Sequence, residues 1–445
     1  MKPSLRKYLY GALIVFCTVF TAFIFINGSK KTTLPELRPR QGALANAPEW
    51  ATTQAKVNKL LEELAAKPED ARTMLMLAKE FMQEGRISGD YSYYNKAALD
   101  LINQVLAKDA TNFEAICLKS MVYLSQHRFT DGKTVAMEAL KANPYNSFVY
   151  GLLCDANVEL GAYDEAVTMA DKMVSVRPDI RSYSRVSYIR EIFGDLPGSI
   201  EAIQMAISAG FPGQEDTEWA RMVLGHLYED SNRLDKAEEQ YTTALRERPD
   251  YPFALAGLGR VAAYKKDYPT AIQYYEKARN VISEVSFLEQ LAVLHRLNNQ
   301  PKEADEYARI TLNALLADNI TAQKNKDEGH YSDMELANMY LLLNEPAKAL
   351  PHAQTEHQRR PQNIDACETL AWTLYQNGQA AQALPYITTA LRTQSQHPER
   401  LVKAGIIMSA NGQKKEGTDL INKGLSLKPY MDETIAKIAQ SIIIG

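Results

Sequence analysis

Residues able to do chemistry are scattered along this 445-residue chain and form no catalytic motif. His352 and His357 are five residues apart, so they do not share the helix face that a metal-binding pair spaced by four positions needs. The sequence has no phosphate-binding glycine-rich loop and no Gly-x-Ser-x-Gly nucleophile elbow. We therefore predict no catalytic residue, no metal site and no cofactor, and we predict that the protein is not an enzyme.

Cysteine spacing and net charge exclude two further classes. Cys17, Cys117, Cys154 and Cys367 lie far apart and form no Cys-x-x-Cys pair, which argues against a zinc ribbon or a disulfide framework. The composition, with 46% apolar and 23% charged residues, is ordinary for a globular protein. A net charge of −4 gives no electrostatic reason to expect nucleic acid, because such binding favours a strongly basic face.

The stretch 218–249 reads as two short amphipathic helices. Its apolar residues recur at i, i+3, i+4 and i+7, which is the helical period. Asn232 and Arg233 interrupt this period and mark a polar turn between the helices. Gly225 and Ala237 fall where the two helices would cross, and only a small side chain lets their axes approach closely there.

This unit resembles the tetratricopeptide repeat (TPR), a helix-turn-helix of about 34 residues. The resemblance is carried by Leu224, Gly225, Tyr228, Ala237, Tyr241, Ala244 and Pro249. Further copies recur along the chain, and Pro144, Pro178 and Pro212 are each 34 residues apart. We count about ten helix-turn-helix repeats. The resemblance implies an all-α fold, a right-handed TPR superhelical solenoid whose first helices line a concave groove. We also expect one transmembrane helix to precede this solenoid.

The N-terminal region predicts a membrane anchor. Residues 8–27 form an uncharged and almost wholly apolar run, long enough to cross the ~30 Å hydrocarbon core of a bilayer. A cleavable signal peptide would have a shorter apolar core followed closely by a small-x-small site. We therefore predict a single-pass membrane protein, in the bacterial inner membrane with its repeats in the periplasm. Basic residues flank both sides, so the cytoplasmic orientation stays open.

Repeat spacing and composition divide the remaining chain. A polar stretch, 318–330, interrupts the repeats, and we interpret it as a solvated connection in preference to an extended helix or a hinge. A final apolar segment predicts a helix that covers the last exposed face of the solenoid. The predicted organisation is a basic tail at 1–7, a transmembrane helix at 8–27, a flexible tether at 28–47, the solenoid at 48–429 and a capping helix at 430–445.

The resemblance also implies where a peptide would bind. In the family, ligands contact the second, fifth, ninth and twelfth positions of the first helices. These positions are occupied here by Trp219, Met222, His226, Phe253, Arg260, Tyr331, Asn338, Glu368, Trp372 and Tyr375. Trp219 and Trp372 are candidate anchors for a peptide, and packing against the neighbouring repeat is the alternative. Met222, Ala256 and Glu368 occupy the lysine position of the chaperone-tail clamp, which disfavours that class of partner.

These observations predict a membrane-anchored TPR scaffold or adaptor that binds partner proteins or peptides through its concave groove, without catalysis. The alternative is the same fold on the cytoplasmic side, as a tethered adaptor of envelope biogenesis. A third hypothesis, an enzyme or enzyme subunit, has no site to support it. The predicted partners are proteins or peptides, together with the membrane through residues 8–27; nucleic acid is excluded and self-association is left open.

Overall fold

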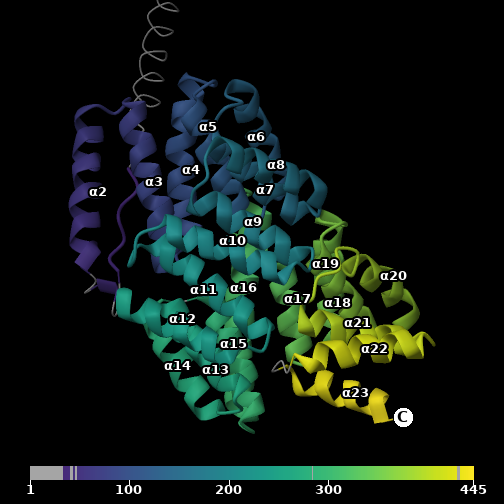
Figure 1. Ribbon diagram of the computed structural model, residues 1–445. Helices are drawn as coiled ribbons and strands as arrows, with labels where there is room; N and C mark the ends of the chain where they lie inside the picture. The colour runs from purple at the N-terminus through teal and green to yellow at the C-terminus, as the bar shows by residue number, and fades with distance from the viewer. Residues whose placement is uncertain (1–33, 41–43, 46–47, 283, 428–430, 445) are drawn as a thin grey trace, which may run out of the picture. The chain divides into compact units, whose positions relative to one another are not determined.

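The computed structural model describes residues 34–40, 44–45, 48–282, 284–427 and 431–444. The chain divides into two compact units, residues 1–38 and 39–445, and the first is described only over 34–38. Every described element of regular structure is a helix, and the second unit contains all those that are labelled (Figure 1). They are α2 (Pro48–Ala66), α3 (Ala71–Ser88), α4 (Tyr91–Lys108), α5 (Phe113–Ser125), α6 (Phe129–Ala142), α7 (Ser147–Leu160), α8 (Tyr163–Val176), α9 (Ile180–Ile192), α10 (Leu196–Ala209), α11 (Glu215–Asp230), α12 (Leu234–Glu247), α13 (Pro252–Tyr264), α14 (Tyr268–Val281), α15 (Val285–Leu297), α16 (Pro301–Lys324), α17 (Asp333–Leu342), α18 (Pro346–Arg359), α19 (Ile364–Gln376), α20 (Ala380–Ala390), α21 (Pro398–Ala410), α22 (Lys414–Ser426) and α23 (Glu433–Ile444).

The helices pair in chain order. Twenty helices, α3 to α22, form ten helix-turn-helix pairs, and the two helices of each pair contact each other more extensively than they contact the next pair. Stacking gives every pair a neighbour against which it buries apolar surface, which no pair could do alone. The prediction of an all-α repeat solenoid is confirmed.

Small residues determine how closely adjacent pairs approach. The ring of Tyr241 in α12 is fully buried, and Ala237 and Ala244 beside it are buried as well. A Cβ added to Gly257 in α13 would lie 2.6 Å from Cδ1 of Tyr241, and one added to Gly225 in α11 would also clash with this ring. The tyrosine therefore fills the space left by two glycines, which explains why the sequence places a small residue at position 225.

Two helices are longer than the sequence pattern indicated. α3 continues through Gly85 and ends at Ser88, where Gly89 takes the left-handed conformation with φ of 77°. α16 extends to Lys324, so the interpretation of 318–330 as a solvated connection is wrong over its first half. The end of α16 stays helical because it is amphipathic. Most of its residues are polar, whereas Asn319 and Ala322 are buried on its inner face.

Part of the segment expected as a flexible tether is fixed on the second unit. The Arg40 side chain is fully buried, and its Nε and Nη2 each donate to the Glu84 carboxylate at 2.8 Å. Its guanidinium also lies 4.8 Å from the centre of the Trp50 ring. Leu44 packs against the apolar cluster that includes Leu255. Arg40 and Leu44 are therefore packed as part of the second unit.

At the other end of the solenoid, α23 packs against both helices of the last pair, α21 and α22. Ile435 and Ala439 are buried in the same apolar cluster as Ile421 and Ile407. This contact covers apolar surface that the final pair would otherwise expose.

The solenoid contacts itself again after about six repeats. Gln126 Nε2, between α5 and α6, donates to the carbonyl oxygen of Asp327 at 3.1 Å, across 201 residues. One pair further along, Arg360 Nη1 donates to the Glu159 carboxylate at 2.6 Å, and Asn363 donates to the Glu159 carbonyl at 3.1 Å. Six repeats of about 34 residues span the same length of chain. We call this set of contacts the seam; it joins residues 125–128 and 158–163 to residues 326–331, 360–364 and 392.

The predicted location requires correction. In the described part of the chain, no helix combines the length and the apolar character needed to cross a membrane. The longest of these helices, α16, carries charged residues near both of its ends. On this finding the prediction of a single-pass membrane protein is wrong. The run at 8–27, on which it rested, lies outside the described residues.

Candidate binding cavity

A cavity of about 2320 Å³ lies inside the second unit. The first helix of every one of the ten pairs contributes to its wall, from α3 at one end of the series to α21 at the other. The resemblance implied this role for the first helices. We call this space the central cavity.

The structure brings most of the predicted groove residues together and separates three from them. Seven line the central cavity: Trp219, Met222, His226, Phe253, Arg260, Asn338 and Trp372. Tyr331 instead lies in the seam, where the Arg359 guanidinium is 4.4 Å from its ring centre. Tyr375 stacks on Trp372 with ring centres 5.2 Å apart, and Glu368 belongs to a buried ion cluster.

The two candidate tryptophan anchors differ in exposure. Trp219 is 44% exposed and meets Phe253 of the next pair edge to face, with ring centres 5.1 Å apart. Trp372 is only 5% exposed, so it packs within the repeat array. Trp219 is therefore the tryptophan that offers a free aromatic surface to a ligand.

Arg260 is held by groups of the preceding pair. Its Nε donates to Glu229 at 2.9 Å and its Nη2 donates to the Tyr241 hydroxyl at 3.0 Å. That hydroxyl donates in turn to Glu229 at 2.7 Å. Burial raises the pKa of Glu229 while Arg260 opposes the rise, and the Arg260 charge lowers the pKa of neighbouring His226. Arg260 thus lines the cavity with its charge already neutralised.

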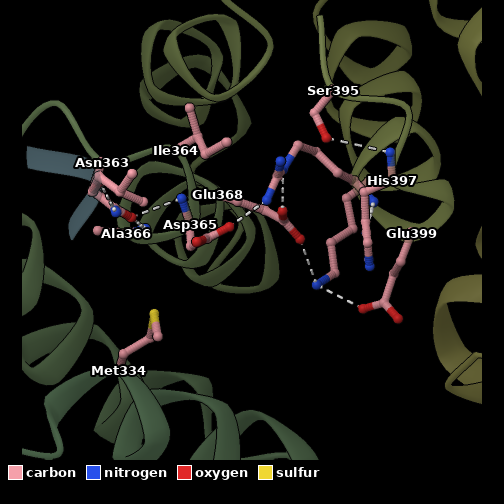
Figure 2. A network of polar contacts seen from close by, with 12 residues as sticks. Met334, Asn363, Ile364, Asp365, Ala366, Glu368, Ser395, His397 and Glu399 are labelled. Carbon is pink, nitrogen blue, oxygen red and sulfur yellow. Dashed lines mark hydrogen bonds and ion pairs between the residues drawn. The ribbon is translucent and has the colours of Figure 1, made fainter. Parts of the chain in front are cut away.

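Glu368 lies at the centre of a network of charged groups (Figure 2). Arg400 Nε donates to its carboxylate at 2.7 Å and Lys403 Nζ donates at 3.0 Å, while Lys403 also pairs with Glu399 at 2.7 Å. Burial alone would raise the pKa of Glu368, but the charges of Lys403, Arg400 and His397 outweigh it and lower this pKa to about 2. The network fixes α19 to α21 and leaves Glu368 unavailable to a ligand.

This shift predicts acid sensitivity. Because the folded-state pKa of Glu368 is about 2 against 4.5 for the free side chain, its stabilising effect is complete above pH 4.5 and disappears as the pH falls towards 2. We expect Glu368→Gln to lower the unfolding free energy by about 3 kcal/mol at pH 7, and the difference from the wild type to vanish near pH 2. Urea denaturation across this range measures both values. Glu416→Gln, at an exposed position of α22, serves as control. If the difference in unfolding free energy between Glu368→Gln and the wild type were the same at every pH, the prediction would be wrong.

Three other carboxyl groups of the cavity form no ion pair within the described part of the chain. Glu191, Glu284 and Glu289 line it, and none forms an ion pair with a lysine or arginine of the described residues. Burial raises the pKa of Glu191 to about 7, and burial together with the charges of Glu335 and Glu284 raises the pKa of Glu289 to about 8. Oε1 of Glu289 is buried without a hydrogen-bond partner. The cavity therefore offers acceptor groups that a cationic ligand would satisfy.

The sequence analysis missed these carboxyl groups, although a signal for them was present. Glu289 is the fifth residue of α15 and Glu191 is the twelfth of α9. These are ligand positions by the same rule that selected Trp219 and His226. The rule was applied to the repeats with the strongest pattern, whereas α9 and α15 belong to other pairs.

The fold and the cavity together define a helical repeat protein in which the first helix of each pair lines an inner cavity. A family model described as tetratricopeptide repeat matches residues 222–284, which cover most of α11 to α14. The resemblance to the tetratricopeptide repeat is confirmed by this match.

Comparison with individual proteins gives partial matches. The chain is similar to protein O-mannosyl-transferase TMTC1 of Homo sapiens, with 25% identity over 187 residues, covering 42% of this chain and 21% of the relative. It thus spans about a fifth of the length of that relative. Among solved structures, it is similar to PilW, described as a widely conserved type IV pilus biogenesis factor, with a TM-score of 0.37, 17% identity and coverage of 45% and 91% of the two chains. A thermophilic TPR protein of Thermus thermophilus gives a TM-score of 0.37, 19% identity and coverage of 46% and 98%.

Proposed function

We propose that this protein is a non-catalytic scaffold whose central cavity binds an extended, positively charged segment of a partner protein. The observation that carries the proposal is the set of carboxyl groups on the cavity wall that form no ion pair within the described residues, Glu191, Glu284 and Glu289, together with exposed Trp219. Association with other proteins is also the general role of TPR proteins.

The size of the cavity favours a polypeptide ligand. Pockets for small molecules commonly enclose about 300–1,000 Å³, whereas this cavity measures about 2320 Å³. Its wall combines charged groups with aromatic rings, and the Trp219–Phe253 pair presents a surface for an apolar side chain of the ligand. An extended segment could contact several repeats at once.

The electrostatics favour a basic ligand. A carboxyl group taken out of water is stabilised in its charged form only if a cation or hydrogen-bond donors accompany it. Glu289 lacks such a group, and its carboxyl neighbours Glu284 and Glu335 make its ionisation still less favourable. A lysine or arginine side chain entering the cavity would supply the missing charge and donor groups.

The Cys117 thiol lines the cavity, and its chemistry favours a binding function over a catalytic one. Burial raises the pKa of Cys117 to about 12, so the reactive thiolate is scarce at neutral pH. The transferase activity in the name of the human relative is not proposed for this chain, since the aligned segment represents 21% of that protein.

Binding of charge-reversed peptides tests the proposal. A fluorescein-labelled peptide of about 12 residues carrying lysines, and the same peptide with glutamates, are titrated with the full chain in EDTA and followed by anisotropy. We expect the lysine peptide alone to bind, more tightly as the pH rises from about 6 to about 9, because Glu191 and Glu289 ionise in this range. Equal binding of the two peptides would refute the proposal.

Variants locate the binding site of that peptide. We expect the double substitution Glu191→Gln and Glu289→Gln to weaken lysine-peptide binding by about tenfold, or ~1.4 kcal/mol. Trp219→Ala should weaken it as well, through loss of aromatic contact area. Glu416→Gln, on an exposed face of α22 outside the cavity, should bind like the wild type. Unchanged affinity in the double variant would place the peptide elsewhere.

A further inference from the structure

The seam holds a cluster of two imidazoles and a carboxylate. His127 lies in the turn between α5 and α6, His330 in the loop before α17, and Glu335 in the first turn of α17. One ligand atom from each of the three residues lies within 4.8 Å of the others. The two histidines are 203 positions apart in the sequence, so only the return of the solenoid upon itself brings them together.

Backbone contacts fix the tautomer of both histidines. Nδ1 of His127 is 3.0 Å from the carbonyl oxygen of Tyr331, and Nδ1 of His330 is 3.2 Å from the carbonyl oxygen of Ser125. A carbonyl oxygen only accepts, so each Nδ1 carries the proton and donates it. Each Nε2 is left with its lone pair. A ligand histidine commonly donates its second nitrogen to a carbonyl in this way, which orients the ring towards the metal.

The carboxylate lacks a partner at the same place. Oε2 of Glu335 is buried and has no hydrogen-bond partner among the described residues. Two imidazoles with a free lone pair and a carboxyl oxygen without a hydrogen-bond partner among the described residues are thus gathered within 4.8 Å. A cation is the group that satisfies all three.

We propose that His127, His330 and Glu335 form a binding site for a divalent transition-metal ion, Zn²⁺ in the first place. Neutral imidazole and carboxylate are zinc ligands, and three protein ligands leave a fourth position for water. Bond lengths of about 2.1 Å in a tetrahedron place the ligand atoms about 3.4 Å apart. The ligand atoms now lie within 4.8 Å of one another, so the three side chains would rotate towards the ion to reach this distance.

The surrounding charges are compatible with a bound cation. Arg359, the last residue of α18, and Arg360, which follows it, lie near the cluster, and carboxylates neutralise both. Arg359 pairs with Asp333 at 2.5 Å, while Arg360 pairs with Glu356 at 2.5 Å and with Glu159 at 2.6 Å. The ion would join the α5–α6 turn to α17 and stabilise the seam, because a ligand that binds only the folded state raises its stability.

Direct metal binding tests this site. The full chain is stripped with EDTA, dialysed and titrated with Zn²⁺ in competition with a coloured chelator, and its thermal midpoint is recorded with and without the ion. We expect one Zn²⁺ per chain and a raised midpoint, with no effect of Mg²⁺. Co²⁺ substitution should give the absorption of a four-coordinate ion. The peptide assay above contains EDTA, so the two proposals succeed or fail separately.

Substitutions decide whether the seam holds the ion. His127→Asn and His330→Asn keep a donor for the backbone carbonyl and remove Nε2, so they should fold and lose the stoichiometric Zn²⁺ and the Co²⁺ spectrum. His357→Ala is the control, because His357 packs on Tyr386 in α20 and belongs to no part of the three-residue cluster. Absence of Zn²⁺ binding in the wild type overturns the proposal. Binding that persists unchanged in both asparagine variants shows an adventitious ion only and overturns it as well.

Discussion

Replacing Tyr241 by alanine is expected to lower the unfolding free energy by about 3–5 kcal/mol, the range seen when a large buried aromatic side chain is truncated. The ring is fully buried between Gly225 and Gly257. Neither glycine has a side chain that could move into the vacated space, so the cavity would persist. The hydroxyl would also be lost as a donor to Glu229 and as an acceptor from Arg260. Urea denaturation followed by circular dichroism measures the change.

Tyr241→Phe separates the two contributions. This variant keeps the ring and removes only the hydroxyl, so it should cost about 1–3 kcal/mol, the penalty for leaving buried polar groups with one partner fewer. If Tyr241→Ala and Tyr241→Phe lowered the unfolding free energy equally, packing of the ring between the glycines would contribute nothing to stability, and the prediction would be wrong.

Replacing Arg40 by alanine is expected to cost about 3–5 kcal/mol, because it breaks a buried ion pair by removing one partner. Glu84 is a residue of α3 with a side chain only 1% exposed, and Arg40 is its sole cationic partner among the described residues. The carboxylate cannot reach water without displacing the helix. We expect a lowered denaturation midpoint and faster amide hydrogen exchange in α3.

A double variant provides the internal control. Arg40→Leu combined with Glu84→Leu removes both charges and retains apolar volume, so it should recover most of the lost stability. Lys59→Ala breaks an exposed pair with Glu63 at 3.9 Å and should change the unfolding free energy by less than about 1 kcal/mol. A double variant as unstable as Arg40→Ala would show that the loss does not arise from an unpaired charge.

Helical periodicity and repeat spacing predicted the fold well, because both are local properties of the sequence. The 34-residue interval between prolines marks the repeat, and the small residues at 225 and 237 mark helix crossings. The length of α16 was missed because a polar composition conceals a single buried face, here that of Asn319 and Ala322.

The site was predictable in position but less so in chemistry. The family rule placed Arg260 in the cavity, yet a sequence position does not reveal that Glu229 already neutralises it. Likewise, the rule selected Glu368 without showing that Arg400 and Lys403 hold it. The seam lay beyond sequence reasoning altogether, since it depends on how many repeats complete one turn. That number is set by small rotations between neighbouring pairs.

The seam also changes how the array should unfold. In an open solenoid each repeat touches only its neighbours, so the ends fray and stability is a sum of nearest-neighbour couplings. Here hydrogen bonds join groups 198 to 231 residues apart. Opening the array at one repeat therefore releases contacts made six repeats away. The consequence is a more cooperative transition than an open array shows, and slower folding, because contacts so distant in sequence form only after most of the chain is ordered.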